Sequence, residues 1–248
     1  MSRLTAGIIV IGDEILSGRT KDTNSNFIAK RLIKSGIQLE EIIIIHDNKE
    51  TIIKNVLSFH KKYNYVFTTG GIGPTHDDIT SESIALAFNQ KYCFHSKAYK
   101  ILKEYYSKGE FNEGRKKMAK MPEKAKLILN PLTAAPGFIV KNIYVLPGVP
   151  LIMKKMFLNL LKYIEKGTPK KIVTININLY ESSIAKGLKK IQIDHPNCSI
   201  GSYPYFNYIT NKGGVNIVIS SWTLLNLDDI IKKIENMISL LDGKSSIV

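Results

Sequence analysis

The first half of the chain alternates short apolar runs with segments whose apolar residues recur at helical spacing. The predicted strands are residues 6–11, 37–45 and 64–69, and the predicted helices are residues 24–35, 49–62 and 79–89. The first run ends at Gly12 and has no polar member, which is typical of a strand buried on both faces. This alternating order predicts an α/β domain with a parallel sheet that helices cover on both faces.

The second half begins with a lysine-rich segment that we expect to be helical over residues 96–120. Two short strands, 137–140 and 143–147, and a helix over 150–165 are expected to follow. Residues 167–169 (Gly-Thr-Pro) have the composition of a linker. We therefore place the end of the first domain at residue 167.

Beyond the linker, residues 171–179 alternate apolar and polar side chains, which predicts a strand with one face exposed. The remaining predicted elements are a helix over 181–191, strands near 198–203 and 214–220, and a helix over 226–241. These elements predict a small α+β module. The expected domains are thus residues 1–167 and residues 168–248.

Composition narrows the class of protein. The chain has 248 residues, of which 44% are hydrophobic and 23% charged, as in ordinary globular proteins. No apolar run approaches the roughly 18 residues that cross a bilayer, and the N-terminus lacks the apolar core of a signal peptide. Two cysteines, Cys93 and Cys198, are too few for a disulfide framework. We expect a cytoplasmic protein with no membrane partner.

The net charge of +14 would suit a polyanion as partner, but its make-up argues otherwise. Only four of the 35 basic residues are arginine, the residue that reads bases and phosphates with two hydrogen bonds. Lysine, isoleucine and asparagine, all abundant here, share AT-rich codons. We therefore attribute the charge to codon usage and do not expect a nucleic-acid partner.

Acidic residues follow each of the first three predicted strands. Asp13 and Glu14 follow the first strand, Asp47 the second, and Asp77 and Asp78 the third. The carboxyl ends of parallel strands share one edge of the sheet, where open α/β sheets bind their ligands. Crowded carboxylates repel, so they indicate a bound cation, and oxygen ligands suit Mg²⁺. The alternative is that Asp47 and Asp78 cap the helices that follow them.

The loop after the third strand carries Gly70, Gly71 and Gly73, followed by Pro74 and Thr75. Glycines permit left-handed backbone and a close approach of a ligand, and their amides before a helix can hold an anion. The spacing matches neither a Walker A loop nor a dinucleotide-binding fingerprint. The loop is predicted to bind phosphate.

Several motifs support a family resemblance. They are Thr69–Thr80 (TGGIGPTHDDIT), Gly12–Gly18 (GDEILSG), Asp22–Ser25 (DTNS), Asn130–Pro131 with Ala135–Phe138 (APGF), Leu146–Pro150 (LPGVP) and Gly201–Pro204 (GSYP). In this order they resemble the molybdopterin-binding (molybdenum-cofactor-biosynthesis) domain superfamily, in the branch of the competence-damage-inducible protein CinA. The resemblance spans nearly the whole chain.

The resemblance implies a three-layer molybdopterin-binding-like α/β domain followed by a KH-like module. The deamidase domain that often follows in CinA is expected to be absent. It also implies metal-dependent hydrolysis of nucleotide pyrophosphates such as ADP-ribose or FAD. The alternatives are a molybdopterin-binding adenylyltransferase of cofactor synthesis and a non-catalytic binder of nucleotides or nucleic acid. A homo-oligomer, dimer or trimer, is expected.

The resemblance and the acid pattern together suggest roles for individual residues. Asp47 and Asp78 are expected to be catalytic and to hold a divalent ion (Mg²⁺, Mn²⁺ or Co²⁺), with Asp13, Glu14 and Asp77 as further metal ligands. The residues expected to bind substrate or phosphate are Gly12, Asn24, Gly70, Gly71, Gly73, Pro74, Thr75, Pro136, Gly137, Pro147 and Gly148.

Two positions depart from the family pattern, and the tail lacks an obvious ligand motif. Thr133 replaces a glycine and Ile152 replaces an acid, which leaves substrate choice open. The tail has no GXXG loop, so we expect a structural or dimerisation module. Its aromatic residues, Tyr203, Tyr205, Tyr208 and Trp222, are expected to pack in the core or an interface, and the alternative is that they stack on bases.

Overall fold

The chain forms two compact units, Met1–Gly167 and Thr168–Val248, which are described separately below. The computed structural model describes residues 3–107, 109–208, 212–223 and 226–248, except for the side chains of Asn207 and Lys212. The division falls within the linker stretch noted in the sequence.

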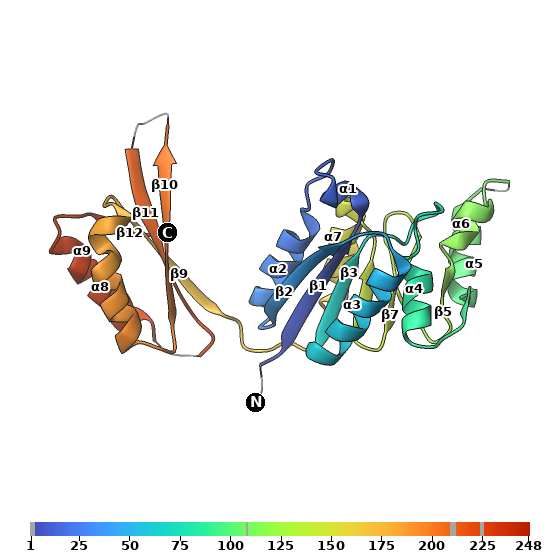
Figure 1. The fold of residues 1–248 in the computed structure, drawn as a ribbon, viewed down its shortest axis with the longest axis horizontal. Helices are drawn as coiled ribbons and strands as arrows, with labels where there is room; N and C mark the ends of the chain where they lie inside the picture. The colour runs from blue at the N-terminus through green and yellow to red at the C-terminus, as the bar shows by residue number, and fades with distance from the viewer. Residues whose placement is uncertain (1–2, 108, 209–211, 224–225) are drawn as a thin grey trace. The chain divides into compact units, whose positions relative to one another are not determined.

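The first unit is built on a six-stranded mixed sheet in the order β2-β1-β3-β8-β7-β6 (Figure 1). Its strands are β1 (Thr5–Ile11), β2 (Gln38–Ile45), β3 (Tyr65–Thr69), β6 (Lys126–Ile128), β7 (Gly137–Val140) and β8 (Ile143–Leu146). The four strands β2, β1, β3 and β8 are parallel, as predicted. The expectation of an all-parallel sheet is wrong at the other edge, because only two residues, Lys141 and Asn142, join β7 to β8, and so short a turn forces antiparallel pairing.

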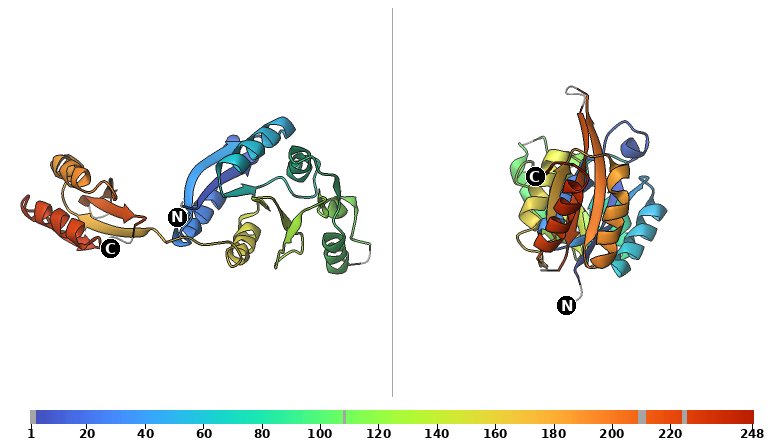
Figure 2. Two further views of the ribbon diagram at one scale, coloured as in Figure 1. Left: turned by 90° about the horizontal axis from the view of Figure 1, so that it is seen from below. Right: turned by 90° about the vertical axis from the view of Figure 1, so that its left-hand side faces the viewer.

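Helices cover both faces of this sheet, as Figure 2 shows. They are α1 (Asp13–Leu16), α2 (Asn24–Lys34), α3 (Lys49–Lys62), α4 (Thr80–Ala87), α5 (Ser96–Tyr105), α6 (Glu113–Lys117) and α7 (Pro150–Leu160). Alternate residues of β1 belong to two separate hydrophobic cores. Ile9 and Ile11 pack with α3 and α4. Ile8 and Val10 pack with α2 and α7. The three-layer arrangement predicted from the apolar run 6–11 is thus confirmed.

The lysine-rich segment is not a single helix. Asn112 begins a new helix, α6, because its side chain accepts a hydrogen bond from the amide of Arg115. A small two-stranded sheet, β4 (Tyr92–Phe94) with β5 (Lys120–Pro122), closes the two ends of the segment together. The prediction of one helical segment over 96–120 is therefore wrong.

The second unit is a four-stranded antiparallel sheet in the order β10-β11-β9-β12, with two helices. Its elements are β9 (Lys171–Ile177), α8 (Glu181–Asp194), β10 (Ser199–Asn207), β11 (Lys212–Ser221), α9 (Asp228–Ser239) and β12 (Ser245–Ile247). The small α+β module is as predicted, apart from β12, whose three exposed residues carry no apolar pattern. In the described part of the chain, no helix has the length and apolar character needed to span a membrane.

Candidate functional site

A cleft of about 520 Å³ lies at the carboxyl edge of the large sheet, where β1, β3 and β8 end. Its walls come from Gly12 after β1, the glycine loop after β3, and Pro147 and Gly148 after β8. The loop before β7 completes it through Asn130 and Pro136. This is the edge at which the sequence places the ligand.

Two glycines fix the loop after β3. Gly70 has φ +104°, and a Cβ there would overlap the carbonyl oxygen of Ile11 on the neighbouring strand. Gly71 has φ +67°, and a Cβ there would overlap the hydroxyl of Thr80 at the start of α4. Both the left-handed backbone and the close packing exclude any other residue. The loop is therefore held tightly between β1 and α4.

The same loop presents open backbone amides to the cleft. The amide of Gly70 donates to the Leu146 carbonyl over 3.1 Å. The next three amides, of Gly71, Ile72 and Gly73, have no acceptor in the part of the chain that the structure describes. Consecutive free amides at a strand-to-helix turn favour a bound anion.

The two helix-capping alternatives are excluded by the observed caps. Asn48, rather than Asp47, caps α3 by accepting from the amide of Thr51 over 2.9 Å. No side chain caps α4. The carboxylate of Asp78 accepts instead from the amide of Thr75 over 2.9 Å and from the Thr75 hydroxyl, so it holds the end of the glycine loop closed. Asp78 also lines the cleft, whereas Thr75 does not.

Asp47 connects the ends of two strands. Its Oδ2 atom accepts a hydrogen bond of 3.0 Å from the amide of Asp13, which begins α1 after β1. Burial raises the pKa of the Asp47 carboxyl, and the nearby charges of Asp13, Glu14 and Asp77 raise it further. The hydrogen bond from the Asp13 amide opposes this rise. The ionised form of Asp47 is thus disfavoured by its burial and by the neighbouring carboxylates.

The other acids divide into two groups. Glu14 and Asp77 line the cleft with Asp47, and hydrogen bonding to Thr75 lowers the pKa of Asp77. The side chain of Asp13 instead pairs with Nδ1 of His46 over 2.7 Å, with both groups exposed to solvent. The structure therefore places Asp13 outside the cleft lining, where it reaches the site only through its backbone amide.

The carboxylates do not form a complete metal site by themselves. Within residues 3–107, 109–208, 212–223 and 226–248, no three His, Cys, Asp or Glu side chains are grouped closely enough to hold an ion. Mg²⁺ commonly takes one or two carboxylates and completes its shell with waters and substrate phosphates. The oxygen donors of the cleft fit an ion held in that way, as do the burial and the neighbouring charges that raise the pKa of Asp47.

The remaining predicted residues have different positions. Gly12, Pro74, Pro136, Pro147 and Gly148 line the cleft. Asn24 lies in a small adjoining cavity of about 50 Å³. Its Nδ2 atom donates to the Gly148 carbonyl over 2.7 Å, and its buried Oδ1 atom has no donor among the described residues. Asn24 therefore supports the loop after β8.

Gly137 has a packing role. It lies on β7, away from the cleft lining, and a Cβ there would overlap the carbonyl oxygen of Val145 on β8. Its requirement for glycine comes from strand packing, and the expectation that it contacts substrate receives no support from the geometry.

The cleft also contains residues that sequence reasoning missed. Thr20, Met118, Asn130, Val149 and Pro150 all line it. The last three lie inside motifs already noted, so position in a motif could have identified them. No sequence signal marks Thr20 or Met118, because the fold of the segments around them decides where they lie.

The two departures from the family pattern both line the cleft. Thr133 fits its turn because its hydroxyl accepts from Nδ2 of Asn130 over 2.6 Å and its amide donates to Oδ1 of the same residue over 3.2 Å. Ile152 adds an apolar side chain in the first turn of α7. The two changes alter the lining of the cleft and leave the glycine loop intact.

Comparison with known protein families separates the two units. Residues 7–166 match the family model described as "Probable molybdopterin binding domain". Residues 171–240 match the model described as "FAD synthase, middle domain". The second match relates the small α+β unit to a model named for FAD synthases, which the resemblance to CinA did not predict.

Individual relatives agree with this division. A protein from Archaeoglobus fulgidus is 39% identical over 205 residues, covering 83% of this chain and 88% of the relative. A "Probable FAD synthase" from Caenorhabditis elegans is 34% identical over 228 residues, covering 82% of this chain but 44% of that protein.

A solved structure resembles the first unit. The crystal structure of CinA from Thermoplasma acidophilum, described as a protein of unknown function, has a TM-score of 0.62 and 33% identity. The match covers 64% of this chain and 97% of that one. The chain belongs to the molybdopterin-binding-domain family, and its first unit is CinA-like.

Proposed function

We propose that the protein is a metal-dependent hydrolase of nucleotide pyrophosphates, acting on substrates such as ADP-ribose or FAD. One observation carries the proposal: three amides of the glycine loop that have no acceptor among the described residues line one cleft with four carboxylates, Glu14, Asp47, Asp77 and Asp78. Amides bind the oxygens of a pyrophosphate, and carboxylates bind the cation that accompanies it. The matches to FAD synthases support a flavin-type nucleotide.

The residues of the cleft divide the work between them. The amides of Gly71, Ile72 and Gly73 donate to phosphate oxygens, and Asp78 keeps their loop in shape through Thr75. Asp47, with Glu14 or Asp77, would hold a divalent ion. Such an ion, when bound, neutralises phosphoanhydride oxygens and lowers the pKa of a bound water. The apolar side chains of Met118 and Ile152 offer a wall for the nucleoside.

The test is to incubate the purified chain with ADP-ribose, FAD, NAD or ATP and Mg²⁺, Mn²⁺ or Co²⁺, and to follow AMP by chromatography. We expect metal-dependent AMP release from ADP-ribose or FAD. The Asp47→Asn variant should lose about 10²-fold in rate, the size seen when one electrostatic stabiliser is removed.

The controls separate this activity from its rivals. The matched control Asp229→Asn removes an acid from the second unit and should leave the rate unchanged. Chelation of the metal should stop AMP release by the parent chain. Transfer of adenylate to molybdopterin without hydrolysis would support the adenylyltransferase instead. Nucleotide binding without any turnover would support a non-catalytic binder and contradict the proposal.

A further inference from the structure

The sheet of the second unit has one covered face and one open face. Both helices, α8 and α9, pack on the same side, against Ile175, Ile177 and alternate apolar residues of β11 (Figure 1). The opposite side chains form a second row, which we call the open face: Ile172, Thr174, Asn176, Ser199, Gly201, Tyr203, Tyr205, Gly214, Asn216, Val218 and Ser220. Apart from Ile172 and Val218, these residues are small, amide-bearing or aromatic, unlike the aliphatic row beneath the helices.

Two tyrosine rings fold back onto this face, each over a glycine. A Cβ at Gly201 would lie 3.0 Å from the ring of Tyr203, two residues along the same strand. A Cβ at Gly214 would lie 3.0 Å from the ring of Tyr205 and 2.8 Å from its hydroxyl. The glycines therefore make room for the rings. Tyr203 remains 58% exposed and Tyr205 39% exposed, so their outward sides face solvent.

Hydrogen bonds hold one of these rings in place. Nδ2 of Asn176 lies 3.0 Å from the hydroxyl of Tyr205 and 2.9 Å from Oδ1 of Asn216. The three side chains come from the three neighbouring strands β9, β10 and β11. A ring fixed in this way loses little freedom when another ring stacks on it.

A second aromatic group lies at the far end of the same face. Ser221 pairs with Lys171 at the end of the β9–β11 register, and Trp222 and Lys170 are the next residues of the two chain segments. Nζ of Lys170 lies 5.6 Å from the centre of the Trp222 ring. Trp222 lies eight positions after Gly214, a span of roughly 26 Å at the rise of an extended strand.

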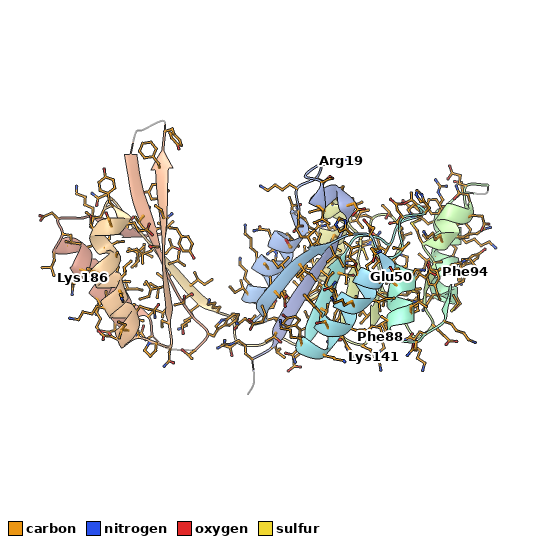
Figure 3. The ribbon with its side chains drawn as sticks, viewed as in Figure 1. Arg19, Glu50, Phe88, Phe94, Lys141 and Lys186 are labelled. Carbon is orange, nitrogen blue, oxygen red and sulfur yellow. The ribbon has the colours of Figure 1, made fainter. Side chains whose placement is uncertain are left out.

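The charges of the unit leave this face free of carboxylates. The second unit contains six acidic residues and nine lysines. All six acidic residues lie in α8, in α9 or in the turn after α9. None lies in the four strands, whereas Lys170 and Lys244 directly precede β9 and β12. Lys186, labelled on α8 in Figure 3, belongs to the helical side. The open face is thus neutral in its centre and basic at its ends.

We propose that the open face binds single-stranded nucleic acid by stacking bases on Tyr203 and Tyr205. Exposed rings on a sheet, flanked by amides and basic ends, fit unpaired bases and their phosphates. The 26 Å span exceeds one nucleotide and suits several. Ile172 and Val218 are the only aliphatic residues among those of the open face named above, which gives a second protein chain little aliphatic surface. The scarcity of arginine predicts binding with little sequence preference, because stacking needs no arginine.

The experiment measures fluorescence anisotropy of a labelled single-stranded oligouridylate of about 12 nucleotides, long enough for one such sheet. The Tyr203→Ala/Tyr205→Ala chain should bind about ten-fold more weakly or worse, given the effect of losing one or two stacked bases. The matched control is Tyr180→Ala, which removes an 80% exposed tyrosine at the start of α8, off the open face. This control should bind like the parent.

Further arms distinguish stacking from other causes. The Tyr203→Phe/Tyr205→Phe chain keeps both rings and should retain most of the affinity. Unlabelled AMP or FAD should not displace the oligonucleotide, whereas rising salt should weaken its binding. Circular dichroism and thermal melting establish that each variant is folded, and AMP release from the first unit should be the same in all of them.

Two results would overturn the inference. One is a parent chain that binds no single-stranded oligonucleotide at low salt, or an alanine variant that binds as tightly as the parent. The other is light scattering in which the alanine variant changes from dimer to monomer with oligonucleotide binding unaltered. That result would make the open face an interface between copies of the chain. Either result leaves the pyrophosphatase proposal standing, since that proposal rests on the cleft of the first unit.

Discussion

The two units use a β-sheet in opposite ways. In the first, helices cover both faces, so the only place left for a ligand is the edge where strands turn into loops. In the second, helices cover one face, and the other presents its side chains to solvent. The first site therefore depends on backbone conformation, and the second on which side chains alternate along each strand.

The strongest test of this contrast compares two adjacent residues of β11. Ile217 is fully buried under the helices, so Ile217→Ala should lower the free energy of unfolding of the second unit by about 2–5 kcal/mol. Val218 lies on the open face, and Val218→Ala should cost less than about 1 kcal/mol. Urea unfolding of the full chain measures both. Equal losses would mean that the open face is itself covered.

The next test concerns the backbone of the first site. Gly70→Ala introduces a Cβ against the carbonyl of Ile11 at positive φ, so we expect a loss of about 2–4 kcal/mol in stability and no AMP release. The matched control is Gly109→Ala, because Gly109 also has positive φ but nothing within 4 Å of its Cβ position. It should cost about 1 kcal/mol and retain activity. A similar loss of stability in both variants would mean that backbone strain alone, and not the contact with Ile11, explains the Gly70→Ala result.

Two acids sharpen the assignment of roles in the cleft. Asp78→Asn weakens the charged hydrogen bonds to Thr75 and should slow AMP release about ten-fold, equivalent to about 1.4 kcal/mol, through a looser loop. Asp13→Asn alters only an exposed side chain paired with His46 and should leave the rate almost unchanged. A larger loss of rate in Asp13→Asn than in Asp78→Asn would contradict the roles that we assign to these two acids.

The smallest effect is the pH dependence of stability. Since burial raises the pKa of Asp47, the folded chain binds this proton more tightly than the unfolded chain does. The ionised group therefore opposes folding at neutral pH, and the penalty disappears as the pH falls through the raised pKa. Asp47→Asn should raise the melting temperature slightly at pH 7 in the absence of metal. The difference should vanish below about pH 3.9, where the parent is protonated in both states. A variant that melts lower at pH 7 would contradict this sign.

Local pattern was enough to predict much of the fold. The apolar run 6–11 predicted the central buried strand, and the glycines at 70–73 predicted the loop that lines the cleft. The antiparallel edge was missed because pairing direction depends on the length of the turn between β7 and β8. The sheet of β4 and β5 was missed because its strands are three residues long and far apart in sequence.

The site was less predictable than the fold. Strand order placed five acids at one edge, yet Asp13 turns away to His46, a choice of rotamer that no spacing encodes. Met118 reaches the cleft from a segment expected to be an uninterrupted helix. For the tyrosines of β10, the sequence left a core, an interface and base stacking open. The exposure of Tyr203 and Tyr205 excludes the core, because Gly201 and Gly214 let the rings lie on the surface of the sheet.

The hydrogen bond from the Asp13 amide to Asp47 limits how this carboxylate can serve a metal. One of its two oxygens already accepts this hydrogen bond, so fewer of its lone pairs would be available to hold an ion. Under the proposed function, the metal would arrive already chelated by the pyrophosphate, and the metal–nucleotide complex would be the true substrate. The rate would then follow the concentration of that complex, and excess free nucleotide would inhibit by occupying the glycine loop without its ion.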